Sequence, residues 1–475
     1  MPEIFDADFS QELCEGTAVS DLDGRYRKAV APLANYFSEA ALQRYRVFVE
    51  SLYLRRLAST GAVRHSLSEF GGLELVSLYS TFSLKGFEEI KKIEKETNHD
   101  VKAVEYFVKN RLSGDMADLK EMVHFGLTSE DVTNLALSMS LKDANSEVMV
   151  PALVNVLEKV TDFAEKTADI PMLARTHGQP ASPTTMGKEF ANFAYRLNVK
   201  ARKLAEFKFE GKLNGATGNF NAHTAAFPDV SWEAFSRSLV EDMGLEYAPY
   251  TTQILPHDNV SDYFRETVGT NKVLEGFAQD AWRYISDDWI KQKVKKEETG
   301  SSTMPHKVNP IDFENSEGNL QIADALLTGI ADKMQISRLQ RDLSGSTVTR
   351  KYGVALGYVL IGCKSLARGM EKIEPNAEET KHILDSHPEV IAEPIQTILR
   401  TKGADKPYEK LKELTRGRKV SLAEIRTFVH GLDVDKETMD RLLALTPETY
   451  IGYAKDLTNA AVAECRKTIK ELKKS

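Results

Sequence analysis

A helical repeat of apolar residues that persists for roughly thirty residues restricts the fold of this chain more than any other feature. From Val260 to Trp289, apolar side chains recur at the three- and four-residue spacing of one helix face. At 1.5 Å per residue, such a helix is about 45 Å long. Helices of this length are common in bundles and rare in compact α/β domains. The repeat therefore predicts a helical bundle.

A second apolar stripe with the same spacing runs from Met186 to Leu204. Ser182-Pro183 precedes this stripe and Pro256-His257-Asp258 precedes the other, and both sequences are typical of helix starts. Alternating strand patterns are scarce. We therefore predict an all-α fold with three helical domains and a central bundle of long helices.

The predicted domains are an N-terminal helical domain (1–117), a central long-helix bundle (118–370) and a C-terminal helical domain (371–475). Glycines interrupt the helical windows of the first domain, and Glu374-Pro375-Asn376 marks a break near the start of the third. A stripe that follows a long helix over its whole length must be buried. Some helix faces are therefore expected to pack against other subunits, in a closed homo-oligomer.

Composition excludes several classes of protein. The 475 residues are 42% hydrophobic and 28% charged, as in an ordinary globular protein, and no apolar run approaches the ~20 residues of a membrane-spanning helix. The acidic N-terminus does not resemble a secretory signal, and three scattered cysteines predict a cytoplasmic protein without disulfides. A net charge of −8 argues against a general nucleic-acid binder but not against an anionic small molecule.

The polar, proline-bearing segment Gly300–Asn319 lies between two long apolar-periodic stretches and is predicted to be a loop. Loops held on rigid scaffolds often carry catalytic groups. Turn chemistry in a simple helix connection is the alternative. A connection alone does not require Lys307, His306 and Glu314.

Three other polar clusters interrupt the helical pattern, at Thr97–Asp100, His124–Asp131 and Ala174–Pro180. Each has a structural alternative, because Thr128-Ser129-Glu130 resembles a helix N-cap, His99 with Asp100 resembles a capping pair, and His177 resembles an ordinary loop histidine. All four clusters lie beside helical stretches, whose ends can converge in space.

The sequence lacks the motifs of zinc sites, P-loops, dinucleotide-binding folds and serine nucleophile elbows. Metal-free and cofactor-free acid–base chemistry remains, with histidine as a proton-transfer group and cations that hold carboxylates or phosphate. In the polar loop, Ser301 lies in a flexible Gly-Ser-Ser segment, and Lys307 can neutralise charge on a carboxylate. Glu314 can orient a histidine from another loop.

The polar loop resembles the signature of the fumarase/aspartase superfamily, Ser-Ser-x-Met-Pro-x-Lys-x-Asn. The Thr-Ser-Glu-Asp, Thr-His-Gly-Gln-Pro and Asn-His-Asp clusters are similar to those of one branch, the adenylosuccinate lyase family in its longer bacterial form. The resemblance extends over almost the whole chain, from Asp23-Gly24-Arg25-Tyr26 to Lys406-Pro407-Tyr408-Glu409-Lys410-Leu411.

The resemblance implies three α-helical domains per chain, a homotetramer with active sites shared between subunits, nucleotide substrates, and neither metal nor cofactor. It also implies elimination of fumarate from adenylosuccinate and from succinyl-aminoimidazole-carboxamide ribotide. By motif match, Ser301 is the general base and His177 the general acid, and Glu314 supports His177. Lys307 and Asn309 hold the succinyl carboxylates, and Lys307 stabilises the carbanion.

The resemblance assigns the nucleotide end of the substrate to a further set of residues. The phosphate and ribose are assigned to Arg25, Tyr26, Arg341, Ser346 and Arg350, with His99 nearby. Thr128, Ser129 and Gln253 complete the pocket. The other positions assigned to substrate binding are Asn98, Asp100, Ser302, Val308, Asn315, Thr347, Val348 and Thr349.

Two alternatives remain open at this stage. Argininosuccinate lyase, fumarase and aspartase share the loop, but their substrates lack a nucleotide phosphate. A phosphorylated substrate is favoured by Arg25, His99, Arg341 and Arg350. A non-catalytic scaffold on the same fold predicts damaged catalytic positions, whereas Ser301 and His177 are both present.

Overall fold

The computed structural model describes residues 13–61, 63, 67–293, 304, 307–415 and 420–474. The chain divides into two compact units. Unit 1 comprises Met1–Ala152, Lys203–Asn271 and Asn319–Ile361, and unit 2 comprises Leu153–Arg202, Lys272–Gly318 and Gly362–Ser475. The two units are each built from three separate chain segments and do not correspond to the three predicted domains, whose ranges stay a prediction. Of their boundaries, 117/118 falls within a 3₁₀ helix and 370/371 at the end of a long helix.

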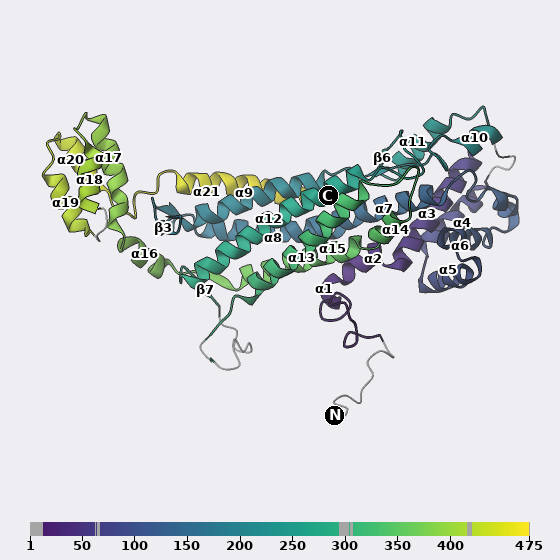
Figure 1. Cartoon of the computed structure of the whole chain (residues 1–475), viewed down its shortest axis with the longest axis horizontal. Helices are drawn as coiled ribbons and strands as arrows, with labels where there is room; N and C mark the ends of the chain where they lie inside the picture. Colours follow the sequence, from purple (N-terminus) through teal and green to yellow (C-terminus); the bar gives the residue numbers. More distant parts are fainter. Residues whose placement is uncertain are drawn as a thin grey trace, which may run out of the picture. The chain divides into compact units, whose positions relative to one another are not determined.

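Five long helices contain the points at which the chain passes from one unit to the other (Figure 1). They are α8 (Val150–Lys166), α9 (Met186–Ala205), α12 (Asp258–Ser286), α13 (Ile311–Met334) and α15 (Tyr352–Glu371).

The other elements of unit 1 are mostly helices. They are α1 (Arg27–Val30), η1 (Ala31–Leu33), α2 (Ala34–Phe37), α3 (Glu39–Ala58), α4 (Glu69–Ser80), α5 (Leu84–Thr97), α6 (Asp100–Lys109), η2 (Gly114–Met122), α7 (Ser129–Ala144), the π-helix η3 (Asn145–Met149), β5 (Glu210–Gly211), α10 (Asn221–Ala226), α11 (Trp232–Asp242), β6 (Glu246–Tyr247) and α14 (Ser344–Thr349). Strands β5 and β6 pair in parallel.

Unit 2 combines short two-stranded sheets with helices. Its other elements are β1 (Pro171–Met172), β2 (Arg175–Thr176), β3 (Gln179–Pro180), β4 (Thr184–Thr185), β7 (Ile290–Gln292), β8 (Ile373–Pro375), α16 (Ala377–Asp385), η4 (Pro388–Ile391), α17 (Ala392–Thr401), α18 (Pro407–Thr415), α19 (Leu422–His430), α20 (Lys436–Ala444) and α21 (Ala454–Leu472). The pairs β1–β4, β2–β3 and β7–β8 are antiparallel. Because every described strand has only two or three residues, the all-α prediction is confirmed.

Both predicted apolar stripes lie on helices, as expected. Helix α9 buries its stripe from Met186 to Leu204. Helix α12 starts at Asp258 as predicted but ends at Ser286, so Trp289, the last residue of its predicted stripe, follows the helix. Helix α9 starts at Met186 rather than directly after Pro183, because Thr184 and Thr185 form β4 and pair with β1.

The polar loop is shorter than predicted. Helix α13 begins at Ile311, so residues 311–319 are helical. Asp312 and Glu314 lie in its first turn, where negative charge interacts favourably with the helix dipole. The long apolar-periodic stretch that follows the polar loop contains three helices, α13, α14 and α15.

Each unit has its own apolar core. In unit 1, Tyr263 and Phe264 of α12 contact Phe209 and Tyr352, and a separate cluster fills the space among α3, α5 and α6. In unit 2, the ring centre of Phe190 on α9 lies 4.3 Å from that of Phe163 and 5.4 Å from that of Phe277.

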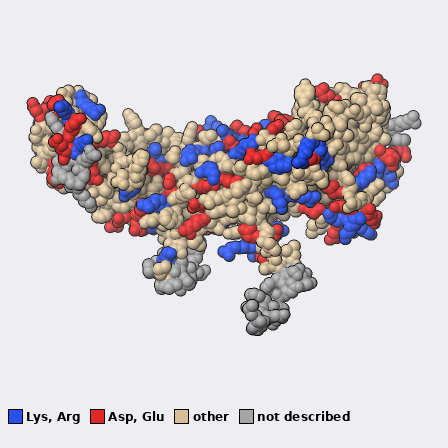
Figure 2. All heavy atoms as spheres, viewed as in Figure 1, with Lys and Arg blue, Asp and Glu red and all other residues tan. Residues whose placement is uncertain are grey.

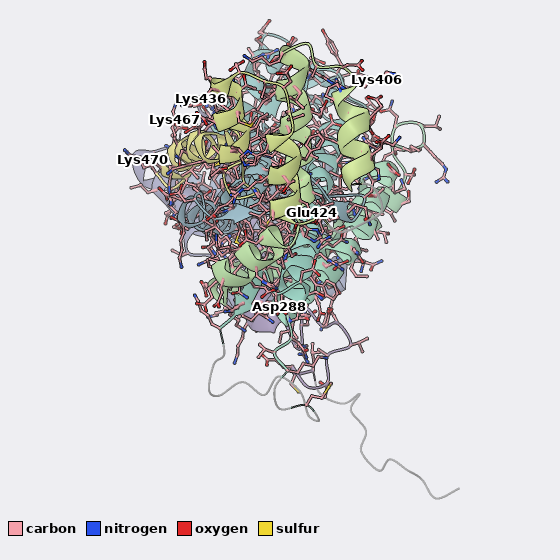
Figure 3. The ribbon with its side chains drawn as sticks, turned by 90° about the vertical axis from the view of Figure 1, so that its left-hand side faces the viewer. Asp288, Lys406, Glu424, Lys436, Lys467 and Lys470 are labelled. Atoms are coloured by element: carbon pink, nitrogen blue, oxygen red, sulfur yellow. The ribbon has the colours of Figure 1, made fainter. Side chains whose placement is uncertain are left out.

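The short helices α17–α20 form a cluster with a core of their own, which includes Ile395, Ile425 and Leu442 (Figures 1 and 3). Charged residues such as Lys406, Glu424 and Lys436 occupy its exposed positions (Figure 3). Acidic and basic side chains are interspersed over the face of the molecule shown in Figure 2. None of the described helices has the length and apolarity needed to cross a membrane.

Close approach of α15 to α2 generates a stability prediction. A Cβ atom at Gly353 would lie 2.4 Å from Cβ of Phe37, so Gly353→Ala forces the backbone apart at a cost of about 1–3 kcal/mol. The matched control is Gly329→Ala on α13, where an added Cβ meets nothing within 4 Å. Alanine there gains about 0.5–1 kcal/mol. Urea unfolding at one protein concentration should show a lower midpoint for the first variant only, and equal midpoints would contradict this close approach.

Candidate active site

The N-terminus of α7 is the centre of the candidate site in unit 1. Thr128 caps this helix, and its backbone N–H donates to Oδ2 of Asp131 at 2.9 Å in a capping box. The helix-cap interpretation of this cluster is thus confirmed. The cap places Thr128 and Ser129 at a helix N-terminus, where the helix dipole favours an anionic ligand.

Arg341 lies against this helix start. Its Nη2 is 3.4 Å from Oε2 of Glu130, and its Nη1 donates to Oε1 of Gln253 at 3.3 Å. The Gln253 amide in turn donates to the carbonyl oxygen of Ala216 at 3.1 Å. Burial raises the pKa of Glu130, while the positive charge of Arg341 opposes the shift. The structure therefore brings together Thr128, Gln253 and Arg341, which the sequence analysis named separately.

The Asn98–Asp100 segment connects to the same helix through Arg46. The His99 Nδ1 accepts a hydrogen bond from the Lys102 N–H at 3.1 Å, so His99 caps α6, as its structural alternative predicted. Arg46 lies 2.8 Å from Asp100 and donates to Thr133 of α7 at 3.2 Å. Burial alone raises the pKa of Asp100, but Arg46 outweighs burial and holds the pKa below its ordinary value.

The predicted phosphate-binding segments flank the start of α15. Tyr26 packs against the same small apolar cluster as Val354 and Tyr358 of this helix, and Arg25 beside it is exposed. Helix α14 carries the predicted residues from Ser346 to Thr349, and Arg350 follows as its C-cap just before α15. These segments thus adjoin the part of α15 that belongs to unit 1.

His177 lies in unit 2, in the turn between β2 and β3. It is exposed and has a left-handed φ of 53°, and Gly178 follows it with a φ of 72°. Arg175 braces the turn by donating to the Gly178 carbonyl at 3.3 Å. The turn therefore presents the imidazole to solvent.

The described part of the polar loop also belongs to unit 2. Lys307 is exposed, and the Gln292 amide holds the Val308 carbonyl at 2.9 Å, just before Asn309. The predicted residues Ser301 and Ser302 lie outside the described residues.

The first turns of α13 are fixed by neighbouring helices. Asp312 lies 3.2 Å from Arg368 and 2.9 Å from Lys372, and Asn315 accepts from the Ser365 hydroxyl at 2.7 Å. Glu314 accepts from the Trp282 indole N–H at 3.1 Å. Among the described residues, Glu314 thus has Trp282 as its hydrogen-bond donor, whereas the sequence predicted a contact with His177.

A pair formed by a buried carboxylate and an imidazole, in the segment that precedes α7, was not predicted from the sequence. His124 Nδ1 lies 2.5 Å from Oε1 of Glu50, which is fully buried. His124 has a φ of 61°, and Gly126 two residues later has a φ of 68° and leaves no room for a Cβ beside the His223 ring. The polar cluster around His124 was visible in the sequence, but Glu50 lies within a helix and carries no local signal.

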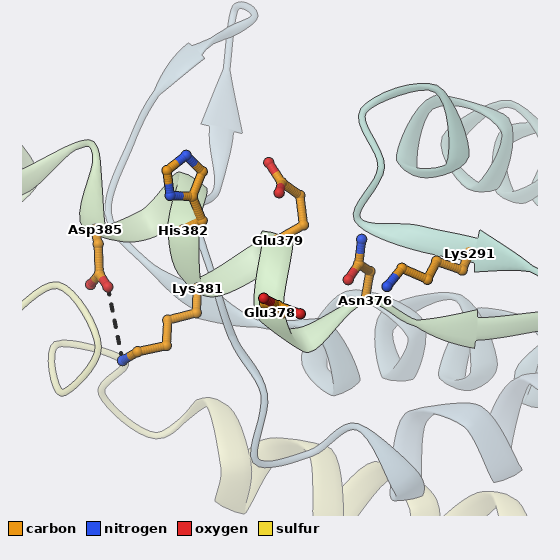
Figure 4. Close-up of a pocket in the computed structure, with 7 residues that line it drawn as sticks. All are labelled: Lys291, Asn376, Glu378, Glu379, Lys381, His382 and Asp385. Atoms are coloured by element: carbon orange, nitrogen blue, oxygen red, sulfur yellow. Dashed lines mark ion pairs between the residues drawn. The ribbon is translucent and has the colours of Figure 1, made fainter.

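The hollow at the start of α16 does not contain the predicted residues. It has a volume of about 650 Å³ and is lined by Lys291, Asn376, Glu378, Glu379, Lys381, His382 and Asp385 (Figure 4). Lys381 and Asp385 form an ion pair at its edge, at 3.9 Å. Over the described ranges, no group of three or more His, Cys, Asp or Glu side chains is placed to hold a metal ion.

Two family models match the chain. A model described as "Lyase" matches residues 24–323, and one described as "Adenylosuccinate lyase C-terminal" matches residues 337–451. The chain is 47% identical over 445 residues to adenylosuccinate lyase of Haemophilus influenzae, covering 93% of this chain and 98% of that protein. It is 46% identical over 449 residues to adenylosuccinate lyase of Escherichia coli K12, covering 93% and 98%.

Solved structures share the fold at low sequence identity. A 3-carboxy-cis,cis-muconate lactonizing enzyme from Pseudomonas putida is 20% identical, with a TM-score of 0.72 over 92% of this chain and 97% of that one. A fumarate lyase from Mesorhizobium sp. BNC1 is 16% identical, with a TM-score of 0.72 over 91% and 97%.

The His124 and Glu50 pair predicts a pH-dependent stability. Burial alone lowers the pKa of His124, but the charge of Glu50 and its hydrogen bond outweigh burial, so the pKa lies above its ordinary value. A raised folded-state pKa gives a stabilisation that is fully present below about pH 6.5, the unfolded value, and lost as pH rises through the folded pKa. A double-mutant cycle with His124→Gln and Glu50→Gln, measured by urea unfolding, should give a larger coupling free energy at pH 6 than at pH 9. Coupling that grows with pH would contradict the assignment.

Proposed function

The chain belongs to the adenylosuccinate lyase family, and we propose that it eliminates fumarate from adenylosuccinate to give AMP. We propose the same reaction for succinyl-aminoimidazole-carboxamide ribotide, which gives aminoimidazole-carboxamide ribotide. The observation that carries this proposal is the 47% identity to an adenylosuccinate lyase over 93% of the chain. The match of residues 337–451 to the family's C-terminal model favours this activity over those of argininosuccinate lyase, fumarase and aspartase.

In the proposed reaction, Ser301 removes a proton from the succinyl carbon next to a carboxylate. The electron pair of that C–H bond forms the double bond of fumarate, and the C–N bond breaks. His177 donates a proton to the departing nitrogen, which is otherwise a poor leaving group. Its exposed turn supports this role, because the imidazole is accessible to a ligand.

Charge stabilisation is the largest demand of this chemistry. The carbanion places two negative charges on one carboxylate, and cations or N–H donors aimed at those oxygens lower the barrier. We assign this role to Lys307 and Asn309. Lys307 supports this assignment because its side chain is exposed. The backbone just before Asn309 is held by the hydrogen bond from Gln292 to the Val308 carbonyl, close to the start of α13, where Asp312 pairs with Arg368.

The nucleotide end is assigned to unit 1. Arg341 offers the phosphate a cation whose position Glu130 and Gln253 define, and Thr128 and Ser129 add the donors of a helix N-terminus. Arg25, Tyr26, Ser346 and Arg350 extend the binding surface along α15. The segment with His99 and Asp100 is connected to this surface by Arg46, which contacts Asp100 and Thr133 of α7.

We further propose a cytoplasmic homotetramer with active sites built from different subunits. Support comes from exposed apolar side chains on the long helices, such as Tyr195 and Val199 on one face of α9 and Ile322 on α13. In such an assembly, the His177 that Glu314 supports belongs to a different subunit, and Trp282 orients the carboxylate.

A direct assay tests the proposed activity. The purified protein should convert adenylosuccinate to AMP and fumarate, followed by ultraviolet absorbance, and should leave argininosuccinate unchanged. Ser301→Ala should lose at least about a hundredfold in kcat on both proposed substrates, because an essential proton-transfer group typically contributes 10²–10⁴-fold. Turnover of argininosuccinate instead would reject the substrate assignment, and near-normal turnover by the variant would reject Ser301 as the base.

Complementation tests the shared site. His177→Gln alone should lose kcat with little change in KM, since it removes the acid and leaves the binding groups. Mixing it with Ser301→Ala under conditions of subunit exchange should restore some activity, because a fraction of the sites then receive both intact groups. Exchange demonstrated by mass spectrometry without any recovery would count against sites shared between subunits.

A further inference from the structure

One buried carboxylate, Asp131, connects two segments that are far apart in the sequence. Its oxygens accept backbone N–H groups from Thr128 at 2.9 Å, Asn214 at 3.0 Å and Gly215 at 3.1 Å. The first donor belongs to the turn before α7, and the other two belong to the loop after β5. Asp131 thus sets the distance between these two segments.

A buried lysine neutralises this carboxylate. Lys212 Nζ lies 3.1 Å from Oδ1 of Asp131, and the side chains of both residues are fully buried. The ammonium group also donates to the Gly215 carbonyl at 3.1 Å. The backbone of Lys212 exchanges two hydrogen bonds with the Asn134 side chain on α7, at 2.9 and 3.0 Å. The ion pair and the amide together attach the loop to the first turns of α7.

The same loop also contacts the segment that contains Gln253. The Asn214 amide donates to the Thr251 hydroxyl at 2.8 Å, and Gln253 donates to the Ala216 carbonyl at 3.1 Å. Gly218 lies so close to this segment that a Cβ there would be 2.5 Å from the Thr251 carbonyl oxygen. Movement of the loop would therefore displace Gln253, which is the hydrogen-bond partner of Arg341.

We propose that the buried pair of Asp131 and Lys212 is a positioning device for substrate binding. It holds the Thr128–Ser129 turn and the Thr251–Gln253 segment at a fixed spacing, so that both face the same ligand. Asp131 and Lys212 are positioning residues, since they act through these segments. This inference rests on the proposed function, because it takes Thr128, Ser129 and Gln253 as substrate-binding residues.

Directional bonds distinguish this arrangement from simple packing. An apolar pair of similar volume fills the same space, but it cannot accept three N–H groups from two segments at defined angles. Displacement of a binding group by about 1 Å can cost up to a hundredfold in rate. The proton-transfer groups Ser301 and His177 lie on other segments, so loss of the pair should weaken substrate binding more than turnover.

The first test compares Lys212→Met and Asp131→Asn with the wild-type protein. Both variants should raise the KM for adenylosuccinate and the inhibition constant of AMP by about tenfold or more, with a smaller fall in kcat. Thr251→Ala is the variant to measure if Lys212→Met does not fold. It removes the hydroxyl that contacts the Asn214 side chain and the Thr252 carbonyl, keeps the buried pair, and should raise KM in the same direction. KM values within twofold of wild type in the folded variants would overturn the proposal.

The second test separates positioning from stability. The double variant Asp131→Asn with Lys212→Met leaves no unpaired buried charge, so its urea midpoint should recover towards wild type while its KM stays raised. Recovery of KM together with the midpoint would overturn the proposal and leave the pair a purely structural role. Tyr263→Phe is the matched control, because it removes the 3.1 Å bond to Asn145, the residue that follows α7, and should lower the midpoint without raising KM.

The wild-type assay keeps the two proposals distinguishable. If the wild-type protein does not convert adenylosuccinate, the proposed function fails. If it does, and the folded variants keep the wild-type KM, only the positioning role fails.

Discussion

Burial of the apolar stripes on the long helices is the constraint on which the rest of the structure depends. Each stripe, such as that of α12, gains stability only when neighbouring helices cover it, at about 25 cal/mol per Å² of apolar surface removed from water. Polar segments are therefore placed at helix ends. Helix ends also carry N–H groups without intrahelical partners. For this reason, the segments around Thr128 and Asn309 connect helices and are also the segments to which we assign substrate binding.

Buried charges add a second level of organisation around the start of α7. Glu50, Asp131 and Lys212 are fully shielded from water, and each has an oppositely charged or ionisable partner. Loss of one partner of such a pair typically costs about 3–5 kcal/mol, because the other charge stays buried and unpaired. Stability and the geometry of the proposed binding surface thus depend on the same contacts.

Periodicity and capping signals predicted much of this fold. The stripes of α9 and α12, the start of α12 at Asp258 and the caps at Thr128 and His99 all agree with the structure. The loop boundary was wrong, because polar residues after Pro310 form the first turns of α13. Glu50 and Lys212 were missed, since a single charged residue in a helix or loop looks the same in a sequence whether it is exposed or paired in the interior.

Helical periodicity and motif spacing are local properties of the chain, so the amino-acid sequence was enough to predict the all-α class, the long helices and the candidate catalytic groups. The tertiary structure decided which of these groups are partners. Arg341 meets Glu130 and Gln253, and Lys212 meets Asp131, only after the helices have packed. The physical reason is that an ion pair or hydrogen bond requires a distance of about 3 Å and a defined direction. Residues far apart in the chain acquire that geometry from the packing of the elements that carry them.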